Sequence, residues 1–525
     1  MLAAKARAAF DLFAASQRFL DGSSHVSISN PAAPTGAPDS SALSLRQPTG
    51  LKVIFFTEMW ERFSYYGMRA LLVLYLVNSL GYTRENALAL YGLYTGLVYF
   101  TPMIGGALAD RYLGKRRAAV IGGTVMMLGH IAMTYEPLLH LALGLLIVGN
   151  GLFKPNTTSM VGDLYDGEND PRRAGGYSIF YMGVNLGAFL APLVAGTLGE
   201  KVGWHYGFGA AAVGMAAGLT QFLLGQKSLG RAGLKAEQGP ITKADLMPLL
   251  AWVGGCVALV VGILLAWKVI GPVYEGLPVL AKIAAALAVI GITLWRIAAP
   301  TKDADVTPLT RADWGRIAGI IIVMFFVIAF WTGFEQAGGT MSLFADKQTD
   351  RNAFGFDVPA SLFQSINPLT IVLLAPVFSI IWTRLDQSRF ALPDTAKQAL
   401  GMIVLGLGFI VMTRAQNLAD TSGPVGPQWL AMVFVIHTIG ELMLSPVGLS
   451  MVSRVAPARL ASLMMGVWFL SSAAAGYLSG TLEHMLQGSG YSLWPFLTVM
   501  SIGSGVLLLL ITPLLSRLMG VKRGV

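Results

Sequence analysis

The sequence predicts an all-α polytopic membrane protein, and three observations lead to this fold class. Only 12% of the 525 residues are Asp, Glu, Lys or Arg, whereas soluble domains carry about 25% charged residues. The hydrophobic fraction is 54% and the mean hydropathy is +0.62. Apolar stretches of about 20 residues, long enough to cross the hydrocarbon core of a bilayer, recur after Gly50. These values exclude a soluble enzyme, a nucleic-acid-binding protein and a disordered scaffold.

The first 50 residues differ from the rest of the chain. Residues 2–20 are compatible with an amphipathic helix, and residues 21–50 are rich in Ser, Pro, Ala and Gly, which is typical of a disordered linker. Asp11 and Arg18 interrupt any apolar core of a signal peptide. We therefore expect an N-terminal cytoplasmic tail over residues 1–50 and a short C-terminal one over 519–525.

The apolar stretches number 14 and group as six, two and six, which predicts 14 transmembrane helices. Six-helix bundles are expected over residues 51–227 and 312–518, and basic linkers with two extra helices over 228–311. We expect the helices near residues 51–80, 86–110, 117–137, 139–163, 173–199, 205–226, 245–268, 275–298, 313–338, 361–384, 395–414, 427–454, 459–484 and 491–517.

The net charge of +9 follows from the membrane and needs no nucleic acid. Most Lys and Arg residues fall in the loops on one side of the expected helices, and this side is cytoplasmic by the positive-inside rule. Because the number of helices is even, both termini are expected in the cytoplasm. We also expect the protein to lie in the inner (plasma) membrane and to be a monomer. Cys256 is the one cysteine of the chain, so no disulfide within the chain can form.

The loop between the second and third expected helices reads GGALADRYLGKRR (Gly105–Arg117). It resembles the loop signature of the major facilitator superfamily, whose fold consists of two parallel six-helix halves. The resemblance implies a cytoplasmic gate that contains Asp110 and Arg111, with Asp110 capping a helix and pairing with a basic residue. An ordinary charged turn is the alternative.

The first expected helix carries Glu58, Glu61, Arg62 and Arg69. Because a charge at the bilayer centre costs about 2.5–3.5 kcal/mol, these side chains are not expected to face lipid. At about 100° per residue they share one face of the helix with Tyr65. This stripe must face a wet cavity or opposing polar helices. An ion-pair network that only holds helices together is the alternative.

Further charges lie in other expected helices, at Lys154, Glu335 and Glu441. When all seven residues are ionised, the four carboxylates exceed the three cations by one, so one added proton would neutralise the set. A cavity of low dielectric favours the neutral count, which indicates proton coupling. No catalytic, nucleotide-binding or metal-binding motif is present. We therefore expect neither an enzyme nor a cofactor or metal, with the proton as coupling ion.

Six motifs follow one another along the chain: EMWERFSYYG (Glu58–Gly67), GLFKPN (Gly151–Asn156), GVNLGAF (Gly183–Phe189), FW-x-x-x-E-Q (Phe330–Gln336), FQSINP (Phe363–Pro368) and GELMLSPVGLS (Gly440–Ser450). They resemble the motifs of the proton-dependent oligopeptide transporter family, a branch of the major facilitator superfamily. The resemblance covers about residues 50–520, and the two extra helices resemble bacterial members. It implies a symporter that imports di- and tripeptides together with protons by alternating access.

The resemblance also implies roles for single residues. Proton coupling falls to Glu58, Glu61, Arg62 and Glu335, and Glu335 would pair with Arg69 when the outer side closes. The peptide carboxylate would meet Arg62, Arg69 and Lys154, and the peptide ammonium would meet Glu441, Asn185 and Asn367. The other expected peptide-binding residues are Tyr65, Tyr66, Tyr99, Trp331, Trp468 and Ser472.

Two other classes of function stay open at this point. One is a proton-coupled transporter of the same fold for another small solute such as nitrate, which has no ammonium group and would not need Glu441. The other is a membrane protein that does not transport, either a channel or an enzyme.

Overall fold

The computed structural model of the chain describes residues 46–167, 170–234, 309–353, 355–457 and 460–520. Most of the expected N-terminal tail lies outside these residues, and so do the two helices expected near 245–268 and 275–298. The expected C-terminal tail is described only to residue 520. The count of 14 helices and the division into six, two and six helices therefore stay predictions.

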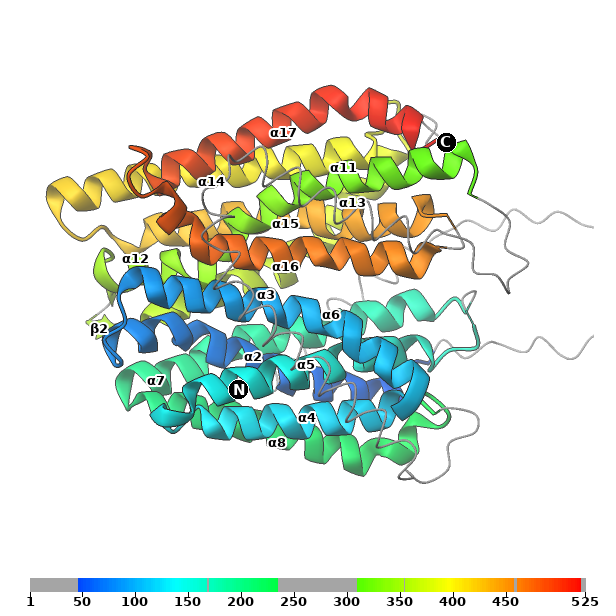
Figure 1. Cartoon of the computed structure of the whole chain (residues 1–525), viewed down its shortest axis with the longest axis horizontal. Helices are drawn as coiled ribbons and strands as arrows, with labels where there is room; N and C mark the ends of the chain where they lie inside the picture. The colour runs from blue at the N-terminus through cyan, green and yellow to red at the C-terminus, as the bar shows by residue number, and fades with distance from the viewer. Residues whose placement is uncertain (1–45, 168–169, 235–308, 354, 458–459, 521–525) are drawn as a thin grey trace, which may run out of the picture. The chain divides into compact units, whose positions relative to one another are not determined.

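The described part of the chain is almost entirely helical (Figure 1). Before residue 235 it contains α2 (Thr49–Asn78), α3 (Arg84–Leu108), η1 (Ala109–Leu113), α4 (Lys115–Ala132), η2 (Glu136–Leu138), α5 (Leu139–Gly162), α6 (Arg173–Ala191), η3 (Pro192–Gly196), α7 (Thr197–Lys201), α8 (Trp204–Gly225) and η4 (Gln226–Leu229). After residue 308 it contains α11 (Arg311–Phe334), η5 (Glu335–Gly338), α12 (Thr340–Lys347), β1 (Asn352–Ala353), β2 (Phe356–Asp357), η6 (Ala360–Ser365), α13 (Ile366–Asp386), α14 (Asp394–Ser422), α15 (Pro427–Val455), α16 (Ala461–Leu486) and α17 (Leu493–Leu518). We call these two sets the first and the second helix group.

Nine helical segments of the described residues are long and apolar enough to cross a membrane. The protein is therefore a multi-pass membrane protein. Helix α2 is not one of the nine, and it is the helix that carries the charged stripe. The short β1–β2 pair is antiparallel, with Asn352 opposite Asp357.

Two expected helices are interrupted in the structure. The helix expected over 173–199 ends at Ala191, passes through the π-helical turn η3 and resumes as α7. Pro192 opens that turn, because its nitrogen has no hydrogen to donate within a helix. The helix expected over 313–338 ends at Phe334, passes through the 3₁₀ turn η5 and resumes as α12 after Gly339.

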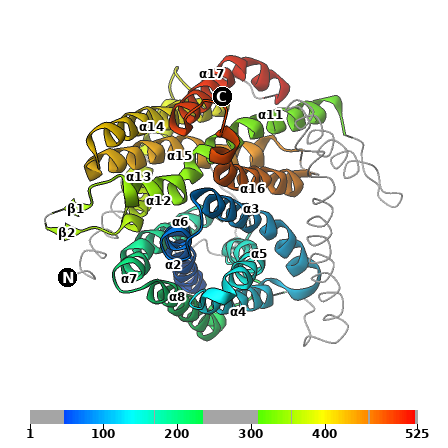
Figure 2. The ribbon, with the colours of Figure 1, turned by 60° about the vertical axis from the view of Figure 1, so that its left-hand side comes forward.

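The two helix groups meet along α3 and α16, which lie side by side in Figures 1 and 2. Small residues allow this close approach, since a Cβ atom on Gly92 of α3 would lie 2.8 Å from the Cα atom of Gly480 on α16. The hydroxyl of Thr95 on α3 lies 3.3 Å from the carbonyl oxygen of Gly476 on α16. Helices α6 and α13 make a second contact between the groups.

Candidate functional site

Helix α2 turns its charged stripe into the protein. Glu58 and Glu61 are fully buried, Arg62 is 8% exposed and Arg69 is 7% exposed. The side chains lie on one face because residues three, four, seven and eleven positions apart recur near the same angle of an α-helix. The expectation that these charges avoid lipid is therefore met, and each must find a partner inside the protein.

Glu58 meets two residues of α5. Lys154 donates to Oε1 of Glu58, and the hydroxyl of Thr157 lies 3.2 Å from Oε2. The side chain of Lys154 is 27% exposed, whereas that of Glu58 has no exposed surface. Nε of Arg62 also lies 3.5 Å from Oε1 of Glu58. The Glu58 carboxylate thus links α2 to α5 from inside the first helix group.

Glu61 and Arg62 pair with each other although they are neighbours in sequence. Nε of Arg62 lies 2.5 Å from Oε2 of Glu61, and Nη2 lies 2.7 Å from Oε1. Both carboxylate oxygens are engaged, which is the strong bidentate geometry of an arginine–carboxylate pair. Nη2 also lies 3.5 Å from Oδ1 of Asn150 on α5, whose amide in turn donates to the carbonyl of Val98 at 3.0 Å.

Arg69 crosses to the second helix group. Its Nη2 donates to Oε2 of Glu335 in η5, and its Nε donates to the hydroxyl of Tyr91 at 2.8 Å. The hydroxyl of Tyr99 lies 3.4 Å from the other oxygen of Glu335. The side chains of Arg69 and Glu335 are 9% and 4% exposed. Removing one member of a buried ion pair is strongly destabilising, because the other charge stays buried without a partner. We therefore expect this ion pair to stabilise the contact between the two helix groups.

Glu441 is the acid of the set without a cation. Among the described residues it forms no ion pair, and its Oε2 accepts a hydrogen bond of 2.8 Å from the amide of Asn367. That amide also lies 3.0 Å from the hydroxyl of Thr438. Asn185 is buried, and its amide donates to the carbonyl of Tyr181 in its own helix at 2.9 Å. The structure thus brings Asn367, but not Asn185, into hydrogen-bond contact with Glu441.

The expected aromatic residues separate into two sets. The guanidinium of Arg62 lies 4.8 Å from the ring centre of Tyr65 and 5.8 Å from that of Tyr66, and Arg69 lies 5.8 Å from Tyr66. These are cation–π distances. Tyr65 and Trp468 are buried at 2% and 6% exposure, so they pack inside the protein in this conformation. The partly exposed aromatic residues are Tyr66, Tyr99 and Trp331, and the expected peptide-binding residue Ser472 is also partly exposed.

Trp468 and Trp331 have different surroundings. A Cβ atom on Gly448 of α15 would lie 2.6 Å from Cζ2 of Trp468, so that glycine makes room for the indole ring. The Trp331 ring meets Phe330 and Phe334 edge to face, at 5.4 and 5.3 Å between ring centres. Trp331 therefore sits on an aromatic surface of α11, one turn before Glu335.

The expected helix cap at Asp110 is wrong. Asp110 is exposed and, among the described side chains, makes no hydrogen bond or ion pair. Helix α4 begins at Lys115, and its N-cap is Gly114, which has φ +72° and provides no side-chain cap. Asp110 lies a full turn earlier, inside η1, and so does not reach the first N–H groups of α4. The side chain of Arg111 lies outside what the structure describes.

The basic residues of this loop contact other carbonyl and carboxylate groups. Lys115 donates to both oxygens of Asp163, at 2.9 and 2.8 Å. Arg116 donates to the carbonyls of Ala232 and Gly230, each at 2.7 Å. Arg116 therefore connects the segment after α8 to the N-terminal end of α4. Its role as a gate stays a prediction.

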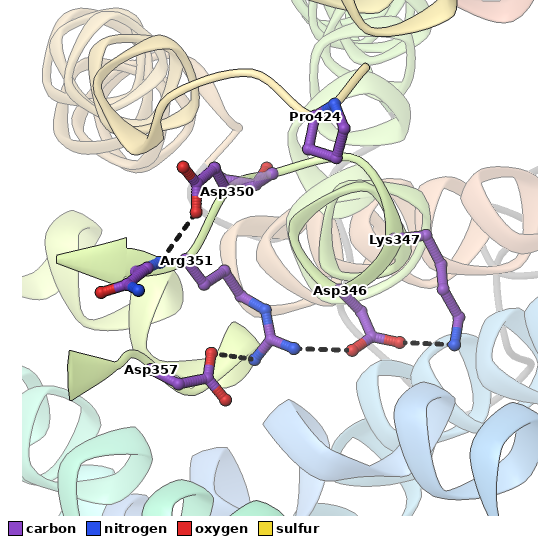
Figure 3. Close-up of a pocket in the computed structure, with 8 residues that line it drawn as sticks. Asp346, Lys347, Asp350, Arg351, Asp357 and Pro424 are labelled. Carbon is purple, nitrogen blue, oxygen red and sulfur yellow. Dashed lines mark hydrogen bonds and ion pairs between the residues drawn. The ribbon is translucent and has the colours of Figure 1, made fainter. Parts of the chain in front are cut away.

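Sequence reasoning missed a second charged cluster, at the β1–β2 hairpin. Arg351 contacts Asp346 at 3.4 Å, Glu200 at 3.5 Å and Asp357 at 3.8 Å. Figure 3 shows Arg351 between Asp346 and Asp357, in a pocket of ≈ 570 Å³. The pocket is lined by Asp346, Lys347, Thr349, Asp350, Arg351, Asn352, Asp357 and Pro424. We call the cluster of Glu200, Lys201, Asp346, Arg351 and Asp357 the hairpin network.

The hairpin network joins the two helix groups. Glu200 of α7 accepts the backbone N–H groups of Ala360 and Ser361 at 2.7 and 2.8 Å, which caps the start of η6. Lys201 contacts Asp357 at 2.5 Å, and this hydrogen bond holds the pKa of the Asp357 carboxyl below its usual value. Charged residues in a loop show no helical or strand periodicity. The only feature of the sequence that could have indicated this network is therefore the high density of charged residues between 346 and 357.

The fold and the buried charges define a multi-pass membrane transporter. The sequence model of the POT family matches residues 116–492. The chain is 38% identical to the uncharacterized transporter YclF of Bacillus subtilis, over 90% of this chain and 95% of that protein. It is 35% identical to the peptide transporter YePEPT of Yersinia enterocolitica, over 91% and 96%. A di-/tripeptide transporter of Lactococcus lactis is 32% identical, over 90% and 97%.

Solved structures agree with these relatives. A crystal structure of a peptide transporter POT in complex with sulfate aligns with a TM-score of 0.75 and 38% identity, over 90% of this chain and 96% of that chain. A POT family transporter in complex with 5-aminolevulinic acid aligns with a TM-score of 0.75 and 33% identity, over 89% and 97%. The chain belongs to the POT family. Because this is a family of transporters, the expectation that the protein is not an enzyme is confirmed.

Proposed function

We propose that the protein is a proton-coupled symporter that imports di- and tripeptides by alternating access. The observation that carries this proposal is that six of seven buried or partly buried charges form three ion pairs, among the described residues, and the seventh forms none. Glu61, Glu335 and Glu58 have Arg62, Arg69 and Lys154 as their closest cations, and Glu441 is left with the amide of Asn367. Relatives named as peptide transporters support the choice of substrate.

A dipeptide is a zwitterion and fits such a charge distribution. Its ammonium would meet Glu441, which forms no ion pair within the described part of the chain. Its carboxylate would meet Lys154, whose side chain is 27% exposed and is the most accessible of the three cations. A site that is acidic on one side and basic on the other orients a zwitterion, because opposite charges steer and select the bound group.

Protons would enter this arrangement through the paired carboxylates. Protonation of Glu58 or Glu61 removes the charge that holds Lys154 or Arg62, and the cation is then free for the peptide carboxylate. Protonation of Glu335 would release Arg69 in the same way. Each step exchanges one buried charge pair for another, so no carboxylate or ammonium has to stay buried without a partner.

Alternating access needs contacts that open and close at the two ends of the helix groups. The Arg69–Glu335 pair and the hairpin network both cross between the groups. The ion pairs Lys115–Asp163 and Arg454–Asp394, by contrast, each join residues of one group. We infer that this conformation is closed at the hairpin end, which is the outer end if both termini are cytoplasmic.

The finer architecture belongs to the same proposal. We propose 14 transmembrane helices in groups of six, two and six, an inner-membrane location with both termini in the cytoplasm, and a monomer that works without metal or cofactor. The excess of Lys and Arg in the loops on the side of the termini supports this orientation.

Uptake into liposomes tests the function. The purified protein, reconstituted into liposomes, should accumulate radiolabelled dialanine above its outside concentration when the outside is acidic, and a protonophore should abolish the accumulation. Radiolabelled nitrate in parallel tests the alternative substrate class. Gradient-driven accumulation of nitrate without dialanine would replace the peptide proposal, and accumulation of neither would refute both.

A further inference from the structure

Thr157 of α5 has one hydroxyl proton and three acceptors within reach. Its Oγ1 lies 3.2 Å from Oε2 of Glu58, 3.2 Å from the carbonyl oxygen of Lys154 and 3.3 Å from that of Phe153. The side chain is buried, at 1% exposure. A hydroxyl donates one hydrogen bond and can accept two. Thr157 can therefore donate either to the carboxylate or to its own helix.

The next residue shows what an ordinary threonine does in this helix. Oγ1 of Thr158 lies 2.9 Å from the carbonyl oxygen of Lys154, one turn earlier, and has no other hydrogen bond among the described residues. This is the usual back-bonding of a threonine within a helix. The two neighbours thus share one backbone acceptor, and only Thr157 of the two reaches a carboxylate.

The groups around Glu58 leave one oxygen to Thr157. Lys154 and Arg62 both approach Oε1, and Glu61 faces Arg62 rather than Glu58. Oε2 has the hydroxyl of Thr157 as its hydrogen-bond partner in the described part of the chain. If Lys154 leaves to bind a peptide carboxylate, Thr157 remains next to Glu58.

We propose that Thr157 is a positioning residue that holds the Glu58 side chain in both its charged and its protonated state. The proposal rests on the symport function above. With Glu58 charged, the Thr157 hydroxyl donates to Oε2. When a proton from water on the acidic side binds Oε2, the new O–H donates to Oγ1, and the Thr157 hydrogen turns to the carbonyl of Lys154 or Phe153. In neither state is a buried polar group left without a partner.

Three variants separate this role from packing. Thr157→Val keeps the shape and removes the hydroxyl, Thr157→Ser keeps the hydroxyl, and Thr158→Val removes the neighbouring hydroxyl as a matched control. In liposomes we expect Thr157→Val to lower proton-driven dialanine uptake roughly 10-fold, since one hydrogen bond to a charged group is lost. Counterflow without a gradient should fall much less. Thr157→Ser should recover most of the driven uptake, and Thr158→Val should match the wild type.

A spectroscopic measurement keeps the test independent of transport. Acidification of the purified protein should produce an infrared band of the protonated Glu58 carboxyl, identified by its absence in Glu58→Gln. We expect Thr157→Val, but not Thr158→Val, to shift this band, because the carboxyl loses a hydrogen bond. An unshifted band in Thr157→Val, equal losses in the two valine variants, or no recovery by Thr157→Ser would overturn the proposal. A shifted band in a protein that accumulates no peptide would refute the symport function and leave the contact in place.

Discussion

Arg69 of α2 and Glu335 of η5 form a buried ion pair that joins the helices before residue 235 to the helices after residue 308. Both side chains are less than one-tenth exposed, so each charge depends mainly on partners inside the protein. Each also meets a tyrosine hydroxyl, Tyr91 on the arginine and Tyr99 on the glutamate. The pair is therefore a specific connection between the two helix groups rather than a surface contact.

Glu335→Gln should weaken closure at the hairpin end, because Arg69 stays charged and buried without a carboxylate. Losses of about 3–5 kcal/mol are typical when one member of a buried pair is removed. Closure can be measured by disulfide formation between cysteines placed at Asn78 and Asp346, in a Cys256→Ser background. In the closed conformation Nδ2 of Asn78 lies 2.9 Å from Oδ2 of Asp346.

Glu483→Gln is the matched control for that experiment. Glu483 pairs with Arg84 across α3 and α16, but the two side chains are 26% and 44% exposed. Exposed pairs contribute about 0–1 kcal/mol, so disulfide formation should stay close to that of the parent. If Glu335→Gln and Glu483→Gln have the same effect, the Arg69–Glu335 pair does not hold the closed conformation.

Asp357→Asn should weaken closure only slightly, and the size of this effect should not depend on pH between 5 and 8. The Lys201 hydrogen bond holds the pKa of Asp357 below its usual value. A carboxyl whose pKa is lowered by its partner contributes to closure above the usual pKa and loses that contribution as pH falls through the lowered value. Between pH 5 and 8 the carboxyl stays charged. In the protein with cysteines at positions 78 and 346, the ratio of disulfide yields with Asp357 and with Asp357→Asn should therefore be constant over this window. A ratio that changes there would contradict the assignment.

Glu61→Gln should abolish proton-driven uptake and leave part of the peptide counterflow. Both oxygens of Glu61 bind the Arg62 guanidinium. A glutamine amide cannot take up a proton, so in the variant protonation can no longer release Arg62. Counterflow needs peptide binding and the conformational change, but no net proton movement. Accumulation at the wild-type level under a proton gradient would show that Glu61 is not required for coupling.

Lys154→Ala should weaken peptide binding through the peptide carboxylate. The variant also leaves Glu58 without its main cation, with Thr157 and the more distant Arg62 as remaining contacts. Amidation of the peptide C-terminus should therefore reduce binding to the wild type far more than binding to the variant. Equal reductions in the two proteins would mean that Lys154 does not contact the carboxylate.

Glu441→Gln should reduce affinity for free dipeptides roughly 10- to 100-fold, because a charge-assisted hydrogen bond contributes about 1.5–3 kcal/mol. N-acetylated dipeptides have no ammonium, so they should bind the wild type poorly and lose little more in the variant. A bridge between Glu441 and Lys154 that closes the opposite end would instead reduce binding of both peptides alike. In the present conformation Lys154 pairs with Glu58. Binding measurements with both peptides decide between the two roles.

The sequence by itself determined the membrane-spanning class, the approximate ends of most described helices and the charged face of α2. These features depend on local composition and on the helical period, which act along the chain and need no knowledge of its neighbours. The motifs also indicated the family, because their order along the chain is preserved. The same reasoning failed at Asp110, because the N-cap of α4 is Gly114, which has no side chain to cap the helix.

The family resemblance implied the Arg69–Glu335 pair, which the structure contains. Only the tertiary structure decided which of the other charges meet. The count of four carboxylates and three cations was visible in the sequence, but not that Glu441 would be the one left to an amide, or that Glu61 would bind its own neighbour Arg62. The hairpin network was likewise absent from the sequence analysis, since Glu200 and Arg351 are 151 residues apart by their numbers. Ion pairing depends on distances of a few ångströms across helix contacts. Helix rotation, the break at Pro192 and the close approach of α3 and α16 set those distances, and none of them follows from a local pattern of residues.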